Sequence, residues 1–179
     1  MKNNLILLNN LLDELIINLR YQSFDNVFGE VLYQPDFEAR LHKEAFKCFE
    51  QAIKIARAEN LLFKVWDVYR PFYVQQMMFD ISAGSPYVSD PATGSVPHCR
   101  GVAIDLTLCD IEGFELDMGT DFDNFTELAH FDSKQISDNA RNHRILLRQI
   151  MTMAGFDSYD KEWWHFQLFK PREYPIINE

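Results

Sequence analysis

The apolar positions of this chain follow two spacings, which predict where its helices and strands lie. Near the N-terminus, residues at helical spacing predict an amphipathic helix, and these residues are Leu8, Leu12, Leu15 and Leu19. A second helical pattern follows Pro35, with Asp36 as the expected N-cap, and continues to about Asn60. Its apolar stripe consists of Phe37, Leu41, Ala45, Cys48, Ala52 and Ala56. We therefore expect two helices before residue 61.

The remainder of the chain alternates between short apolar runs and helical patterns. We expect strands over residues 61–69, 102–109 and 163–169, and helices over residues 72–82 and from Ile136 to Ala154, before Gly155. There is no internal repeat, and no composition change marks a linker. The pattern predicts an α+β fold, in which a small, mostly antiparallel sheet is flanked by helices and carries the functional site.

Length and charge narrow the choice of partner. A chain of 179 residues that is 47% hydrophobic is long enough for one compact domain, which we expect to cover residues 1–179. With 27 acidic and 17 basic residues, the net charge of −10 argues against nucleic acid and anionic membranes, both of which select clustered Lys and Arg. The expected partner is a small molecule.

Cysteine usage and the N-terminal composition favour a cytoplasmic location. The three cysteines have no paired spacing, so a secreted disulfide framework is not expected. The apolar run of residues 5–8 is interrupted by polar residues too early for a signal peptide, and no stretch is long enough to span a bilayer.

Two separated motifs carry the chemistry. His98 and Asp105 lie in the segment PHCRGVAID (residues 97–105), and Glu162 and His165 lie in EWWH (residues 162–165). Two histidines and one aspartate are the ligand set of a catalytic zinc that keeps its fourth position for water. A glutamate beside one ligand is placed to take a proton from that water. The sequence therefore predicts a zinc hydrolase.

Each motif also has a simpler interpretation. His98 and Asp105 would form an ordinary ion pair, and the second motif would be a hydrophobic edge with a buried histidine. An aspartate among the apolar residues of the 102–109 strand is costly to bury unless it is paired or binds a metal. Glu162 and His165 are three residues apart, which places them on opposite sides of a regular strand, so a twist or bulge at Glu162 is needed for both to face one site.

Two further charged residues are candidates for substrate contacts. Arg70 precedes Pro71 at the end of a predicted strand, where its guanidinium would hold an oxyanion or a carboxylate, or simply pair with an acid such as Asp67. Asp123 is a solvated acid or a helix cap in the simplest interpretation, and a binding group for a substrate ammonium in the functional one.

The ordered set of motifs resembles a known family, the zinc D-alanyl-D-alanine dipeptidases of the VanX type, within the D,D-carboxypeptidase-like metallopeptidases. The resemblance is distributed over residues 21–26 (YQSFDN), 66–71 (WDVYRP), 98–108 (HCRGVAIDLTL), 117–120 (DMGT) and 162–166 (EWWHF). An ordered set of this kind is far more specific than any one motif.

The resemblance implies specific roles. His98, Asp105 and His165 would bind one zinc ion per chain, and Glu162 would be the catalytic base. Arg70 would stabilise the transition state, and Asp123 matches the position that the family uses for the substrate amino group. The resemblance also makes a homodimer plausible.

This chain departs from the family at two positions beside the first zinc ligand. Val96 stands where the family usually has a serine two residues before the histidine, and Ser95 lies one step further back. Cys99 replaces a common serine, a change that would expose the site to oxidation.

The expected reaction is hydrolysis of free D-alanyl-D-alanine to two D-alanines. A D,D-carboxypeptidase acting on longer peptidoglycan stem peptides is the main alternative, because it would use the same metal chemistry with the amino side of the pocket open. A non-catalytic zinc-containing domain that binds peptides is a third possibility. The separate glutamate speaks against it, because a structural zinc site more often has four protein ligands.

Overall fold

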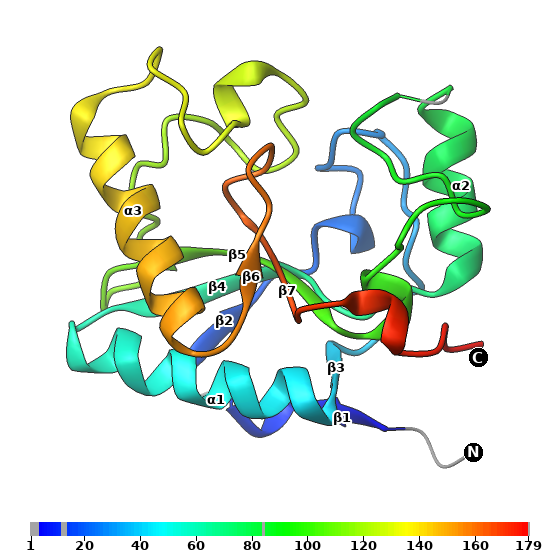
Figure 1. Cartoon of the computed structure of the whole chain (residues 1–179), viewed down its shortest axis with the longest axis horizontal. Helices are drawn as coiled ribbons and strands as arrows, with labels where there is room; N and C mark the ends of the chain where they lie inside the picture. The colour runs from blue at the N-terminus through cyan, green and yellow to red at the C-terminus, as the bar shows by residue number, and fades with distance from the viewer. Residues whose placement is uncertain (1–3, 12–13, 84, 179) are drawn as a thin grey trace.

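The computed structural model describes residues 4–11, 14–83 and 85–178, and a five-stranded sheet lies at its centre (Figure 1). In spatial order the strands are β2 (Leu15–Ile17), β4 (Leu62–Asp67), β5 (Ala103–Cys109), β7 (His165–Gln167) and β6 (Asp157–Ser158). β2 runs parallel to β4, and the other neighbouring pairs are antiparallel. The predicted α+β fold with a mostly antiparallel sheet is confirmed.

The described residues form three α-helices, α1 (Lys43–Ala58), α2 (Phe72–Ile81) and α3 (Asp138–Met153), of which α1 and α3 pack against the sheet. Figure 1 shows α1 and α3 adjoining one another, with α2 set apart on the right. All seven residues of β5 are buried, so the central strand is covered on both faces. Short 3-10 turns complete the fold: η1 (Leu8–Leu11), η2 (Arg20–Gln22), η3 (His98–Arg100), η4 (Glu127–Ala129) and η5 (Pro171–Glu173).

The prediction of an N-terminal helix is wrong. Residues Leu5–Leu7 form β1, which pairs antiparallel with β3 (Arg40–His42), and β2 joins the central sheet a few residues later. Leu8, Leu15 and Leu19 are all buried. The leucine spacing therefore identified buried residues correctly, but it did not predict the backbone conformation. The β-branched pair Ile16 and Ile17 favours the extended backbone that pairing with β4 requires. Leu12 lies outside the described residues.

The second helix is real but begins later than predicted. Asp36 is an exposed turn residue, and the N-cap is His42, whose Nδ1 accepts a hydrogen bond from the Glu44 amide at 3.4 Å. Pairing with β1 keeps the backbone extended through His42, so Phe37 and Leu41 precede the helix. The buried face of α1 nevertheless follows the predicted stripe from Ala45 to Ala56.

The other elements agree with the expected ranges to within a few residues at their ends. β4, α2 and β5 are confirmed, and α3 ends just before Gly155, whose φ of +104° is readily adopted only by glycine. β7 is shorter than predicted, because residues 163 and 164 form a turn. The extent of a single domain over residues 1–179 stays a prediction. Within the described ranges, no helix is long and apolar enough to cross a membrane.

Candidate metal centre and active site

The sheet register brings the predicted metal ligands together. Asp105 is the third residue of β5 and lies directly opposite His165, the first residue of β7. His98 reaches the same point from the 3-10 turn that precedes β5. Asp105 Oδ1 is 2.9 Å from His165 Nδ1, and Asp105 Oδ2 is 3.2 Å from His98 Nε2. The two imidazole nitrogens are 3.3 Å apart.

The far nitrogen of each imidazole has a fixed partner. His98 Nδ1 lies 2.6 Å from the Val68 carbonyl oxygen, and His165 Nε2 lies 3.2 Å from Gln167 Oε1. A carbonyl oxygen only accepts, so each of these nitrogens carries the proton when the ring is neutral. The lone pairs of His98 Nε2 and His165 Nδ1 then face each other beside the Asp105 carboxylate. Such outer contacts set the tautomer of metal-binding histidines.

The spacing of these three atoms fits a zinc ion. Ligands at about 2.0–2.1 Å from a tetrahedral zinc lie about 3.3 Å from one another, and the three observed separations are 2.9, 3.2 and 3.3 Å. All three residues are buried, and in the described part of the chain they form the one cluster of His, Cys, Asp or Glu side chains with metal-ligand spacing. The donor set therefore suits zinc with one position open.

Glu162 lies beside this cluster without joining it. Its Oε2 is 4.0 Å from His165 Nδ1. A turn places the two residues on one side, because the His165 amide donates to the Glu162 carbonyl at 3.2 Å and strand β7 begins only at His165. The sequence spacing required a twist or bulge at Glu162 for Glu162 and His165 to face one site, and this turn provides it. Burial raises the pKa of Glu162 to about 8, despite the opposing effect of His165.

Arg70 forms an ion pair with Asp67 and also faces the pocket, so both interpretations of this residue from the sequence apply. Its Nε and Nη2 donate to Asp67 Oδ2 at 3.0 and 2.6 Å, and its Nη1 donates to Gln75 Oε1 at 2.7 Å. Tyr33 donates its hydroxyl to the other oxygen of Asp67. Arg70 is 8% exposed and lines the same pocket as the metal cluster. The ion pair thus holds Arg70 in place at the pocket wall.

Asp123 is neither a solvated acid nor a helix cap. It has a left-handed backbone with φ of +56°, lies 8% exposed in the segment between β5 and α3, and accepts a hydrogen bond from the Tyr21 hydroxyl at 2.8 Å. Burial raises its pKa to about 7, although the hydrogen bond from Tyr21 favours the ionised form. A buried carboxyl group of this kind is suited to bind a cation.

The two departures from the family pattern lie close to this site. Val96 is buried with φ of +39°, a strained value for a β-branched residue, and both Ser95 and Val96 line the pocket. Cys99 is fully buried as a free thiol, and burial raises its pKa to about 11. Because oxidation proceeds through an accessible thiolate, the expected sensitivity to oxidation finds no support.

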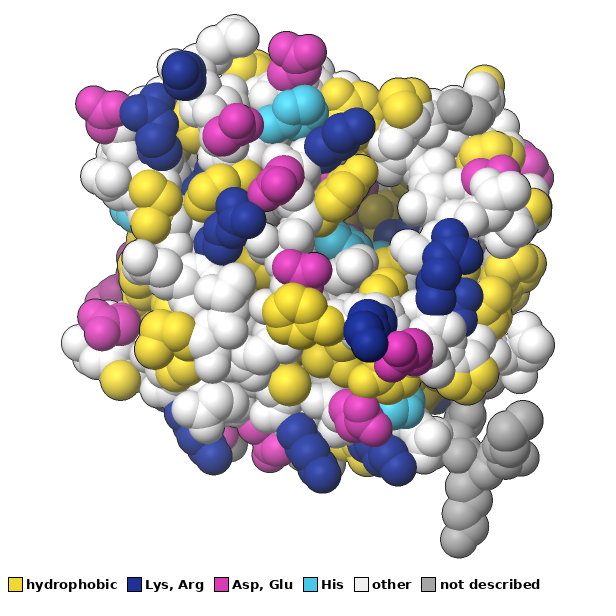
Figure 2. Space-filling model, in the orientation of Figure 1, with side chains coloured by type: hydrophobic (Ala, Val, Ile, Leu, Met, Phe, Trp, Pro, Cys, Tyr) yellow, Lys and Arg dark blue, Asp and Glu magenta, His cyan; other side chains and the backbone are white. Residues whose placement is uncertain are grey.

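One pocket of about 220 Å³ unites all six predicted site residues. It appears as a hollow on the face of the molecule in Figure 2. The predicted residues in its lining are Arg70, His98, Asp105, Asp123, Glu162 and His165. Sequence reasoning missed Tyr21, Gln75 and Gln167, which also line it. Gln167 could have been identified from the sequence, because it lies two residues after His165 and residues two apart in a strand share a face.

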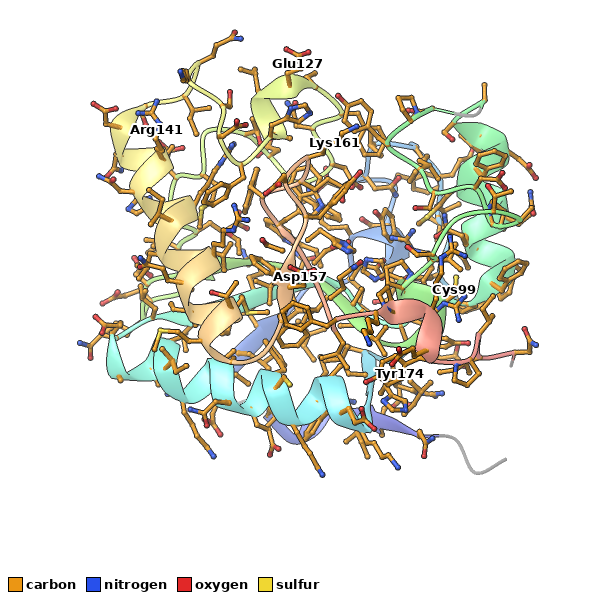
Figure 3. The ribbon with its side chains drawn as sticks, viewed as in Figure 1. Cys99, Glu127, Arg141, Asp157, Lys161 and Tyr174 are labelled. Carbon is orange, nitrogen blue, oxygen red and sulfur yellow. The ribbon has the colours of Figure 1, made fainter. Side chains whose placement is uncertain are left out.

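The C-terminal segment supports the turn that carries His98. The Ile177 amide donates to the Cys99 carbonyl at 2.9 Å, and Arg100 donates to the carbonyl oxygens of Ser95 and Tyr174. Figure 3 shows Cys99 and Tyr174 on the two neighbouring segments. The turn is thereby held from both the preceding loop and the tail.

Metal-dependent hydrolases activate water on a metal ion that has three protein ligands and one coordination position left for water. A separate buried carboxyl group beside the metal takes the proton. That is the class to which this fold and site point. Within it, the chain belongs to the peptidase family M15 of D-ala-D-ala dipeptidases, whose family model matches residues 1–175.

Individual relatives are similar over most of the chain. The D-alanyl-D-alanine dipeptidase of Escherichia coli (strain K12) is 40% identical over 166 residues, which cover 92% of this chain and 84% of that protein. The D-alanyl-D-alanine dipeptidase of Enterococcus faecium is 30% identical over 189 residues and 92% of each chain. Among solved structures, a mutant of the vancomycin resistance D,D-pentapeptidase VanY in complex with Zn(II) covers 76% of each chain at 16% identity, with a TM-score of 0.47.

Proposed function

We propose that this protein hydrolyses the free dipeptide D-alanyl-D-alanine to two D-alanines. The observation that carries the proposal is one pocket with the His98, Asp105 and His165 cluster together with the buried carboxyl of Asp123. Family membership and two relatives named as D-alanyl-D-alanine dipeptidases support the same substrate.

One zinc ion per chain would be held by His98 Nε2, Asp105 and His165 Nδ1. When bound there, zinc supplies Lewis acidity that lowers the pKa of water and polarises a carbonyl group. The spacing of the three donor atoms supports this assignment, as does the hydrogen bond that each far imidazole nitrogen makes.

Glu162 would be the general base and then the general acid. It takes a proton from the attacking water and delivers it to the nitrogen of the leaving D-alanine, so no covalent intermediate with a cysteine or serine is needed. Its buried position supports this role, because burial brings the pKa of the carboxyl to about 8, near a working pH. A carboxyl with an ordinary pKa would return the proton to the leaving amine less readily.

Arg70 would stabilise the negative charge that develops on the carbonyl oxygen. A guanidinium that is already positioned by Asp67 and Gln75 needs no reorganisation during the reaction, which is where such donors gain their effect. Because Nε and Nη2 both donate to Asp67, the orientation of the planar guanidinium is fixed.

Asp123 would bind the ammonium group of the dipeptide. The Asp123 carboxylate is buried, where an unpaired negative charge is unfavourable, and the ammonium group would supply a positive partner. This pairing favours a free dipeptide over a carboxypeptidase substrate, in which the same nitrogen is an uncharged amide. The separate Glu162 likewise favours catalysis over passive peptide binding.

The deciding experiment is the release of free D-alanine from D-alanyl-D-alanine by zinc-loaded protein. The L,L dipeptide, a D-Ala-D-Ala peptide with a blocked amino group and a chelator-treated sample serve as controls. Chelator-sensitive cleavage of the free D,D dipeptide alone is the expected result. Cleavage of the blocked peptide would indicate a carboxypeptidase, and binding without cleavage would indicate a peptide-binding domain. Action in the cytoplasm and assembly as a homodimer stay predictions.

A further inference from the structure

Two aromatic rings from different segments meet at the pocket. Tyr87 lies in the connection between α2 and the turn of His98, and Phe125 lies in the long segment between β5 and α3. Their ring centroids are 5.2 Å apart and their planes differ by 1°, which is the offset parallel arrangement that aromatic pairs favour. Both residues line the pocket and both are half-buried.

Each ring is connected to a charged group of the site. Phe125 is two residues from Asp123 and packs edge-on against Phe28 with centroids 6.3 Å apart. Phe28 in turn contacts Tyr21, the residue that donates to Asp123. Phe125 is therefore linked through Phe28 and Tyr21 to the carboxyl group to which we assign the substrate ammonium.

The segment of Tyr87 is held on the other side. Gln75 donates from Nε2 to the Ser89 carbonyl at 2.8 Å and accepts a hydrogen bond from Arg70 at 2.7 Å. The Val88 amide also donates to the Ser85 carbonyl at 3.1 Å. The position of Tyr87 is thus tied to the residue that faces the scissile carbonyl in the proposed mechanism.

We propose that Tyr87 and Phe125 form a barrier that closes the amine end of the pocket and restricts this enzyme to dipeptides. The inference rests on the proposed function and adds the residues that set substrate length. An additional residue on the substrate nitrogen has to pass the place where the two rings stack. The charge preference of Asp123 disfavours such a substrate separately, because the amide nitrogen is neutral.

The experiment compares kcat/KM for L-alanyl-D-alanyl-D-alanine with kcat/KM for D-alanyl-D-alanine. In Tyr87→Ala and Phe125→Ala the ratio of tripeptide to dipeptide activity is expected to rise by roughly 10-fold or more, the scale at which pocket shape discriminates substrates. Tyr87→Phe keeps the ring and should keep the ratio of the unchanged protein. Asp123→Asn, which removes only the charge, should not raise activity on the tripeptide to the same extent.

Two exposed aromatic residues provide matched controls. Phe114 lies in the same segment as Phe125 and is 73% exposed, and Tyr73 lies on α2 and is 48% exposed. Neither lines the pocket, so Phe114→Ala and Tyr73→Ala should leave the ratio unchanged. If either alanine variant loses its fold, as judged by circular dichroism, Tyr87→Leu and Phe125→Leu replace it, since leucine removes the stack and retains apolar bulk.

The outcomes separate the two proposals. If the unchanged protein fails to cleave D-alanyl-D-alanine, the proposed function is wrong. If it cleaves the dipeptide but folded variants without the stack show an unchanged ratio, the barrier is wrong and the function stands. A rise in the ratio for Phe114→Ala equal to that for Phe125→Ala would also overturn the barrier.

Discussion

The two ends of the pocket are built in different ways. At the metal end, Asp105 and His165 are direct partners in the β5 and β7 ladder, and the His98 turn leads into β5. At the other end, Asp123 depends on a left-handed backbone residue, on Tyr21 from a distant part of the chain and on stacked rings from two loops. Backbone hydrogen bonds thus position the metal end, and side-chain packing positions the amine end.

Under the proposed function, this difference would separate the residues that carry the chemistry from those that select the substrate. Ladder geometry leaves little freedom at the metal end, so changes there should reduce the rate or the affinity for the metal. Loops tolerate substitution more readily, so changes at the amine end should alter KM and the choice of substrate. Single substitutions in each region test this division.

The largest effect is expected for Glu162→Gln at the metal end. The amide has the same shape but accepts no proton, so kcat should fall by about 10³-fold, within the range of general acid–base catalysis. Zinc content by atomic absorption and dipeptide binding by calorimetry should be retained. Full activity in this variant would exclude Glu162 as the base.

Arg70→Lys should be the next most damaging change. Lysine keeps the charge but cannot reproduce the fork that binds Asp67 and Gln75. We expect kcat to fall by about 10²-fold with zinc content unchanged, as for loss of one preorganised donor. Steady-state kinetics at saturating zinc measure this, and an effect confined to KM would move Arg70 from rate to substrate binding.

Asp123→Asn tests the amine end. We expect KM to rise by about 10-fold or more with a smaller change in kcat, because an uncharged amide attracts an ammonium group less strongly. Burial raises the pKa of Asp123 to about 7, so the carboxyl becomes protonated as the pH falls through 7 and dipeptide binding should weaken.

The pH dependence of binding is best measured by calorimetry in the Glu162→Gln background, where the other raised carboxyl cannot titrate. Affinity should fall between pH 8 and pH 6 when Asp123 is present and change much less in the Asp123→Asn double variant. Equal pH dependence in both proteins would show that another group binds the ammonium.

The smallest effect is expected for Gln167→Ala. Gln167 accepts a hydrogen bond from His165 Nε2 and so favours the tautomer that presents Nδ1 to the metal. Losing such an outer contact typically weakens metal affinity by about 10-fold or more. Competition with a chromogenic chelator measures the zinc affinity, and Gln167→Glu, which still accepts, should retain it. A change in KM without a change in zinc affinity would contradict this role.

The clustering of His98, Asp105 and His165 is easier to predict from the sequence than the surroundings of Asp123, for a physical reason. His98, Asp105 and His165 occur in short motifs, and the alternation of β5 already puts Asp105 on a defined face. The barrier of Tyr87 and Phe125 depends on where two loops meet, which no local spacing encodes. The N-terminal leucines failed as a helix predictor because pairing with other strands overrode their periodicity.

The three residues of the candidate metal cluster come from separate segments of the chain, so the cluster exists only where those segments have folded together. His98 and Asp105 lie near the middle of the sequence, but His165 comes from the last strand, and the turn of His98 is held by Tyr174 and Ile177. A truncated chain without β7 and the tail would therefore lack both the third residue of the cluster and the contacts that hold the turn of His98.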